Sequence, residues 1–257
     1  MSTDDDWEAW GKNDPYFGVI TDPRFRRQQM NDAEHAYFFE SGRVHAHYVI
    51  DVARQRLDPA YMPQRVLDFG CGVGRVLLPC AQVAKSAVGI DVSASMLAEA
   101  RRNTDRLGLS NVEFLHQGDL SGLEPGSFDL VHSAIVLQHI DVDRGLRLFG
   151  DLVGLVGHHG VGAIQLTYSK DHYAATLGIA PAPPAADPVP ARRPLFRLSD
   201  AGKAAAKEPA AEPVMQMNPY PLTPLFFQLQ KASIRNVHVE FTDHGGELGV
   251  FLFFQRT

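Results

Sequence analysis

Short runs of apolar residues alternate with helical patterns through the centre of the chain, from Arg65 to about Tyr168. This alternation is typical of βαβ units and predicts an α/β fold with a parallel sheet. Two more strands are expected near the end of the chain, and the last of them is apolar on both faces, as in a strand buried inside a covered sheet. The predicted strands cover residues 65–69, 86–91, 112–117, 128–134, 161–168, 236–243 and 248–255.

Helical spacing of apolar residues predicts three helices within this pattern. The first follows Ser93, a good N-cap, and ends at Gly108, and the second covers about 143–156. The third begins at Thr223-Pro224, with proline at the first helical position.

The segment before residue 62 is predicted to form an N-terminal helical cap. The run 31–57 indicates a helix that is interrupted near Ser41-Gly42. Nine of the 24 aromatic residues occur in the first 48 positions, too many for a solvated tail. We therefore divide the chain into a cap, residues 1–61, and a larger domain, residues 62–257.

A proline- and alanine-rich stretch interrupts the second half of the chain. Residues 180–194 hold six prolines and five alanines, a composition that cannot build a core. Together with its flanks, residues 171–213, it is predicted to be a mobile, lid-like insertion in the larger domain.

Composition narrows the classes of function. The net charge of −6 offers no basic surface for nucleic acid. The acidic N-terminus and the absence of an apolar run of about 18 residues argue against a membrane segment, so a cytoplasmic protein is expected. Cys71 and Cys80 suggest neither a disulfide framework nor a zinc site, no metal is expected, and whether the chain forms a homodimer stays open.

The sequence VLDFGCGVGR, residues 66–75, places a glycine-rich turn between the first strand and a helix. Such a turn lets backbone amides approach a ligand closely. Gly70, Gly72 and Gly74 give the spacing G-x-G-x-G. A dinucleotide-binding fingerprint would have its third glycine at position 75, where this chain has Arg75.

The order of acidic residues after successive strands resembles that of class I S-adenosylmethionine-dependent methyltransferases. The resemblance implies a Rossmann-like seven-stranded sheet, mostly parallel with an antiparallel last strand, flanked by helices. It places Asp68 and the glycine loop at the methionine part of the cofactor, Asp91 at the ribose hydroxyls and Asp119 at adenine. A carboxylate that accepts from both hydroxyls of a diol is well suited to select ribose. The cofactor contacts so implied are Asp68, Gly70, Cys71, Gly72, Asp91, Val92, Met96, Gly118, Asp119, Leu120 and Ser133.

Two histidines are candidate general bases. His139 follows the fourth strand, where the resemblance places the transferring methyl group, and His244 lies in the bend between the last two strands. A structural role stays open for both. His45 and His47 are two residues apart, the wrong spacing for a metal pair on a helix. His158 and His159 are expected to be exposed, in a hairpin that forms through Gly160.

The predicted function is methyl transfer from S-adenosylmethionine to an oxygen or nitrogen atom of a small molecule. An NAD(P)-dependent oxidoreductase and a non-catalytic partner subunit that binds S-adenosylmethionine are the alternatives. No catalytic base is needed if the acceptor is a carboxylate or a free amine, so the sequence leaves the acceptor and the base open.

Overall fold

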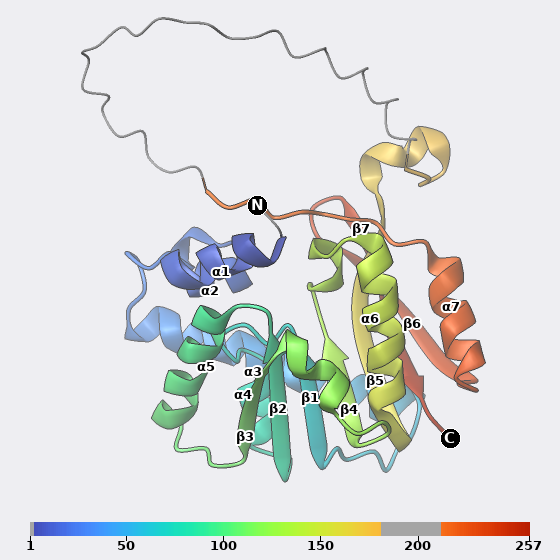
Figure 1. Ribbon diagram of the computed structural model, residues 1–257, viewed down its shortest axis with the longest axis horizontal. Coiled ribbons are helices and arrows are strands. Elements are labelled where there is room, and N and C mark those ends of the chain that lie inside the picture. The colour runs from blue at the N-terminus through green and yellow to red at the C-terminus, as the bar shows by residue number, and fades with distance from the viewer. Residues whose placement is uncertain (1–2, 181–211) are drawn as a thin grey trace, which may run out of the picture.

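The computed structural model describes residues 3–180 and 212–257, and the strands of these residues form one seven-stranded sheet (Figure 1). The strand order is β3-β2-β1-β4-β5-β7-β6. Neighbouring strands are parallel except that β7 runs antiparallel to both β5 and β6. The predicted fold class is therefore confirmed. The strands are β1 (Arg65–Phe69), β2 (Ser86–Asp91), β3 (Val112–His116), β4 (Phe128–Ser133), β5 (Val156–Lys170), β6 (Asn236–Asp243) and β7 (Glu247–Gln255).

The antiparallel strand β7 is buried along most of its length, from Gly249 to Gln255. It lies between β5 and β6, and helices cover both faces of the sheet beside it. Apolar side chains on both of its faces are thereby removed from water, which accounts for the unbroken apolar run in its sequence.

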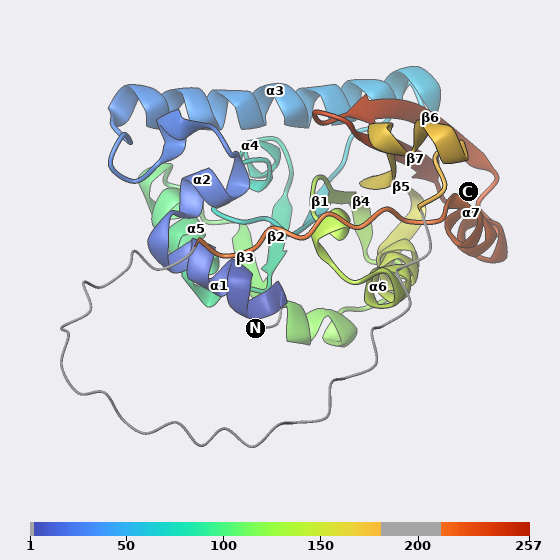
Figure 2. The ribbon, with the colours of Figure 1, turned by 90° about the horizontal axis from the view of Figure 1, so that it is seen from above.

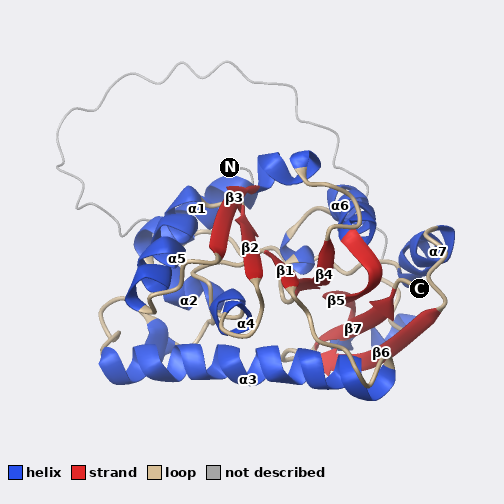
Figure 3. Ribbon diagram, turned by 90° about the horizontal axis from the view of Figure 1, so that it is seen from below, coloured by secondary structure: helices blue, strands red, loops and turns tan. Residues whose placement is uncertain are grey.

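Helices form a layer on each face of the sheet. The helices α3 (Asp32–Arg56), α4 (Leu77–Ala81) and α5 (Ala94–Arg106) share one core with the sheet, and α6 (Val142–Leu155) and α7 (Leu222–Lys231) share another. Figures 2 and 3 show α3 running along one side of the molecule, with α6 on the opposite side. Ser93 caps α5 as predicted, by accepting from the amide of Met96. The helix α7 begins at Leu222, so Pro224 is its third residue and not its first.

The aromatic residues of the N-terminal segment are packed. This segment folds into α1 (Thr3–Asn13), α2 (Pro15–Val19) and a short 3-10 turn, Pro23–Phe25, ahead of α3. Trp10, Tyr16, Phe25 and Phe38 are buried together and touch Met96 of α5. The segment therefore has its own apolar core, which is joined to the sheet domain through α5.

The break predicted near Ser41-Gly42 is wrong, because α3 is one uninterrupted helix. Gly42 serves a different purpose. A Cβ atom on this residue would lie 1.9 Å from the carbonyl oxygen of Arg75. The glycine lets α3 approach the turn after β1, and this tertiary contact is invisible in the local sequence.

The predicted hairpin through Gly160 is also wrong. The strand β5 begins at Val156 and continues through Gly160, with a register shift where it leaves Phe128 of β4. His159 has a left-handed backbone, with a φ of 63°, and His158 and His159 are exposed as expected. Residues 156–160 therefore belong to one long strand whose pairing with β4 is interrupted, and they do not form a separate hairpin.

The central part of the predicted insertion, residues 181–211, lies outside the described residues. Its first part includes a 3-10 turn, Asp171–Thr176, and its last residues run into an extended stretch that reaches α7. No helix in residues 3–180 and 212–257 is long and apolar enough to cross a membrane. Cys71 and Cys80 are buried free thiols.

Candidate functional site

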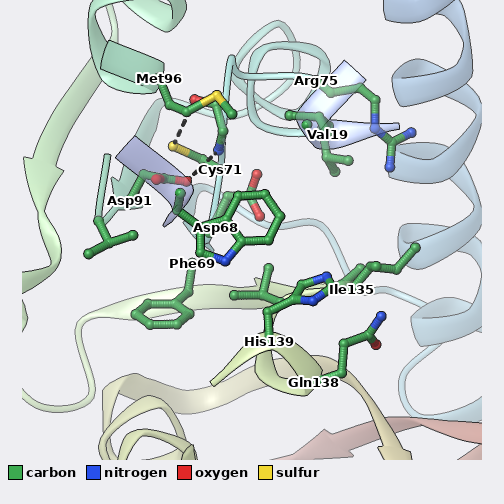
Figure 4. Close-up of a pocket in the computed structure, with 18 of the residues that line it drawn as sticks. Val19, Asp68, Phe69, Cys71, Arg75, Asp91, Met96, Ile135, Gln138 and His139 are labelled. Carbon is green, nitrogen blue, oxygen red and sulfur yellow. Dashed lines mark hydrogen bonds between the residues drawn. The ribbon is translucent and has the colours of Figure 1, made fainter. Parts of the chain in front are cut away.

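A cavity of about 530 Å³ lies at the carboxyl ends of β1, β2 and β4 (Figure 4). The strand order reverses between β1 and β4, which is where open α/β sheets bind ligands. The lining residues at the ends of these strands and in the segments that follow them are Asp68, Phe69, Gly70, Cys71, Gly72, Asp91, Val92, Met96, Ala134, Ile135, Val136, Gln138, His139 and Ile140. Most of the predicted cofactor contacts therefore lie in this one cavity.

The glycine loop needs glycine for two reasons. Gly70, Gly72 and Gly74 have left-handed backbones, with φ values of 75°, 53° and 89°. Neighbouring side chains also lie close, since a Cβ atom on Gly70 would be 2.3 Å from Val136 and one on Gly72 would be 2.6 Å from Val19. The loop backbone is thus enclosed between the turn after β4 and the end of α2.

Asp91 is held by backbone amides. Its Oδ2 accepts from the amide of Gly72 at 2.9 Å, and its Oδ1 accepts from the amide of Ser93 at 2.8 Å. Burial raises the pKa of Asp91 to about 6, although these amides favour the charged form. Each carboxylate oxygen keeps a second lone pair, so the group can still accept from the two hydroxyls of a ribose.

Asp68 is tied to two histidines that the sequence did not connect with it. Its Oδ1 lies 2.7 Å from Nδ1 of His132, and Nε2 of His132 lies 3.0 Å from Nε2 of His45 on α3. If Asp68 is ionised and His132 is neutral, His132 donates from Nδ1 to Asp68 and accepts at Nε2 from His45. Burial, with His132 and Arg75 nearby, lowers the pKa of His45 to about 2, so this histidine is neutral.

The candidate base His139 is buried beside the cavity. Its Nδ1 lies 2.6 Å from the carbonyl oxygen of Gln216 and therefore carries the proton, which leaves a lone pair on Nε2. The indole of Trp7 lies against the imidazole, with ring centroids 5.0 Å apart. Burial lowers the pKa of His139. The second candidate, His244, lines the same cavity from the bend between β6 and β7.

Four of the predicted cofactor contacts do not line the cavity. Asp119 is exposed, and its Oδ2 accepts from the amide of His116 at 3.2 Å. Leu120 is part of the apolar core, and Ser133 is buried with no hydrogen-bond partner for its hydroxyl in the described part of the chain. The fourth is Gly118, whereas its neighbour Gln117 does reach the cavity. Contact of these four residues with adenine or the cofactor stays a prediction.

The structure adds cavity residues from the two ends of the chain. They are Asp4, Trp7, Gly18, Val19, Ile20 and Thr21 from the N-terminal segment, Ser41 of α3, and Met215 and Met217 before α7. No motif marks them, because only the tertiary fold brings them to the sheet.

The turn after β4 contains a strained residue. Ile135 has a φ of 59°, which is unfavourable for a β-branched side chain. Its amide donates to Oε1 of Gln165 on β5 at 2.9 Å. The contact holds Ile135 in the cavity wall, next to the valine that covers the glycine loop.

Comparison with known proteins gives a domain family. Residues 66–160 match the family described as a methyltransferase domain. Among solved structures, the fold is similar to magnesium protoporphyrin IX methyltransferase from Synechocystis PCC 6803 with bound S-adenosylhomocysteine, with a TM-score of 0.59, 18% identity and full coverage of both chains. It is also similar to the N-methyltransferase NodS from Bradyrhizobium japonicum WM9 in complex with S-adenosylhomocysteine, with a TM-score of 0.58, 15% identity and coverage of 100% and 99%.

Two curated relatives match this chain over short segments. A 23S rRNA (uracil(1939)-C(5))-methyltransferase from Edwardsiella ictaluri is 46% identical over 54 residues, which are 21% of this chain and 12% of the relative. The corresponding enzyme from Methylococcus capsulatus is 44% identical over 73 residues, 28% of this chain and 16% of the relative. The chain thus matches only a small part of either relative. Residues 66–160 thus form a methyltransferase domain, and the observed sheet has the seven-stranded, mostly parallel form that the resemblance to class I S-adenosylmethionine-dependent methyltransferases implies.

Proposed function

We propose that this protein transfers the methyl group of S-adenosylmethionine to an oxygen or nitrogen atom of a small molecule. The observation that carries the proposal is that one cavity contains both the Asp91 carboxylate beside the glycine loop and the His139 imidazole. Its volume of about 530 Å³ is in the range of small-molecule sites.

A small acceptor is favoured over RNA. The net charge of −6 does not favour binding of a nucleic acid, and the two matches to rRNA methyltransferases cover 21% and 28% of this chain. Of the two solved structures named above, one is titled a magnesium protoporphyrin IX methyltransferase and the other an N-methyltransferase.

The residues of the chain would hold and align the reactants. When bound, the cofactor supplies a methyl group made electrophilic by its sulfonium. Asp91 accepts from the ribose, and the apolar walls exclude water around the acceptor. As the acceptor atom bonds to the methyl carbon, the carbon–sulfur bond breaks and its electron pair stays on sulfur. A hydroxyl or amine acceptor loses a proton, and Nε2 of His139 can take it while Nδ1 keeps its bond to Gln216.

A screen for S-adenosylhomocysteine release tests the proposal. The protein is incubated with S-adenosylmethionine and pools of phenols, alcohols, amines and carboxylic acids, and the Asp91→Asn variant serves as the control. We expect release that depends on the acceptor pool and falls at least tenfold in the variant. Tight cofactor binding with no release from any pool would favour the non-catalytic partner subunit. The oxidoreductase alternative is disfavoured by the domain match and by Arg75 at the position of the third glycine.

A further inference from the structure

Strand β6 forms an open edge of the sheet. It is the last strand in the order, and among the described residues no strand pairs with its outer side. Figure 3 shows β6 beyond β7, with the end of α3 on one side and α7 on the other. Its pairing with β7 runs from Asn236 to Asp243 without a register shift, and none of its eight residues is buried. The outward amides and carbonyls of such a strand are available to another strand.

The edge strand β6 lacks most of the features that usually protect an edge. It has no proline, no lysine and no bulge, and the charges that it carries are of both signs. The side chain of Phe241 is 81% exposed. Alternation places it on the same face as Val237 and Val239, which pack against the core beneath α7. Because Phe227 of α7 is exposed too, apolar surface on this side of the sheet extends to the edge.

The sequence around β6 is complementary to itself in antiparallel pairing. When two copies of a strand pair about a two-fold axis, side chains keep their faces only if one residue lies opposite its own copy. With Val239 at the axis, the opposed pairs are Arg235 with Asp243, Asn236 with Thr242, Val237 with Phe241, and His238 with Glu240. Opposite charges and apolar side chains are thereby matched. With Glu240 at the axis, two carboxylates would be opposed, which is unfavourable.

The central charged pair is already held in position within one chain. Nε2 of His238 lies 3.0 Å from Oε1 of Glu240, and the hydroxyl of Tyr48 on α3 donates to Oε2 of the same carboxylate. A second copy would place another His238 and Glu240 opposite this pair in reversed order. The four side chains would then alternate donor and acceptor around the axis.

We propose that two copies of this chain associate through β6, antiparallel about a two-fold axis at Val239, so that their sheets become continuous. A second copy is the favoured occupant of this edge because the strand matches itself in charge and in apolar contact. No residue of β6 lines the cavity, although the bend that follows β6 brings His244 to it. The inference therefore does not depend on the proposed function.

Sedimentation equilibrium of the full chain tests the interface. We expect the wild type to form a reversible dimer and Phe241→Lys to raise the dimer Kd at least about tenfold, because a lysine at this position blocks edge pairing. The exposed side chain makes no core contact, so the variant should keep the wild-type Tm and S-adenosylhomocysteine affinity. Leu107→Lys is the matched control, since Leu107 is an exposed apolar residue at the end of α5, whose neighbour β3 forms the opposite edge of the sheet. It should dimerise like the wild type.

A charge exchange tests the register. Arg235→Asp alone should weaken the dimer roughly tenfold, because it opposes two carboxylates at two symmetric positions, and Asp243→Arg alone should weaken it similarly. The double variant should recover most of the wild-type affinity. It cannot recover the bond that Asp243 accepts from the amide of Gly246, so recovery would come from the exchanged pair.

Three results would overturn the inference. One is a wild type that remains monomeric at every concentration, as expected if another segment of the same chain covers the edge. Another is a dimer that Phe241→Lys leaves intact or that Leu107→Lys weakens equally, which would place the interface elsewhere. The last is a double variant that dimerises no better than the two single variants, which would refute the register at Val239.

Discussion

We expect the Asp91 carboxyl to make cofactor affinity dependent on pH. Burial raises its pKa to about 6, and ribose hydroxyls donate to the ionised form. Above pH 6 the group is already ionised, so the affinity for S-adenosylhomocysteine should be constant. Below pH 6 a proton must leave on binding, and the Kd should rise by up to about tenfold per pH unit. Calorimetry between about pH 5 and pH 8 measures this. Asp91→Asn should bind more weakly with no such dependence, and wild-type affinity that is flat down to pH 5 would contradict the assignment.

His139 is expected to affect turnover more than cofactor binding. Its Nδ1 is bonded to Gln216, which leaves Nε2 free to take a proton, so His139→Ala should lower the rate constant at saturation by roughly 10² to 10⁴ if the acceptor is a hydroxyl. S-adenosylhomocysteine affinity should stay within about twofold, because the proposed ribose contact is Asp91 and not the imidazole. His158→Ala, which changes an exposed histidine outside the cavity, is the matched control. A rate that is unchanged at every pH would remove His139 from the mechanism.

Single residues could be predicted from the sequence where a strand end fixes their place. Asp68 and Asp91 lie at the carboxyl ends of β1 and β2, so a motif and a strand pattern suffice to bring them to one cavity. His132 could have been found from sheet pairing, since it lies opposite Asp68 in the β1–β4 register. The contact with His45 could not, because it depends on how α3 crosses the sheet.

Two carboxylates of α1 hold this helix over the cavity, one by hydrogen bonds to the start of α5 and the other by an ion pair with α6. Glu8 accepts from the hydroxyls of Ser93 and Ser95 at 2.8 Å each, at the start of α5, and Asp4 pairs with Arg144 of α6 at 2.7 Å. Burial opposes ionisation of Glu8, but these bonds outweigh it and lower its pKa to about 2. Trp7 lies between the two attachments and reaches the cavity.

We therefore expect Glu8→Ala to loosen α1 and speed ligand release. Stopped-flow measurement should show S-adenosylhomocysteine dissociating roughly tenfold faster, which corresponds to a loss of about 1.4 kcal/mol in closing the helix. Glu124→Ala, an exposed glutamate outside the cavity lining, should release the ligand at the wild-type rate. Equal rates for Glu8→Ala and wild type would mean that α1 does not restrict the cavity.

Gly42 gives a stability test of the contact between α3 and the glycine turn. Helix propensity alone predicts that alanine stabilises a helix by about 1 kcal/mol. The structure predicts the opposite, a loss of roughly 1–3 kcal/mol, because the new Cβ would lie 1.9 Å from the carbonyl of Arg75. Gly154→Ala in α6 is the control, since nothing lies within 4 Å of its Cβ position. Thermal denaturation should show a lower Tm for Gly42→Ala than for Gly154→Ala, and the reverse order would refute the contact.

The limits of helices and strands could be predicted where the local pattern of apolar residues determines them. The limits of β1, β2 and β6 agree with the pattern of apolar runs, because strand length and burial on the sheet set them. The breaks expected at Gly42 and Gly160 were wrong for one reason. Each glycine is required by a neighbouring segment, Arg75 in one case and β4 in the other, and not by a turn in its own chain.

The cavity is built partly from the matched domain and partly from segments near the two ends of the chain. The matched domain, residues 66–160, supplies the glycine loop, Asp91 and His139. Trp7, Met215, Met217 and His244 lie outside that domain and complete the cavity wall. The sequence could predict the centre from a motif, whereas the outer wall depends on contacts between segments roughly 200 residues apart, which no local pattern encodes.

The central claim is that this cavity binds S-adenosylmethionine and not a nicotinamide dinucleotide. Competition calorimetry with the wild-type protein tests it most directly. We predict that S-adenosylhomocysteine binds a single site per chain, that S-adenosylmethionine competes for that site, and that NADH neither binds there nor displaces either ligand. Absence of binding by S-adenosylhomocysteine, or its displacement by NADH, would contradict the account.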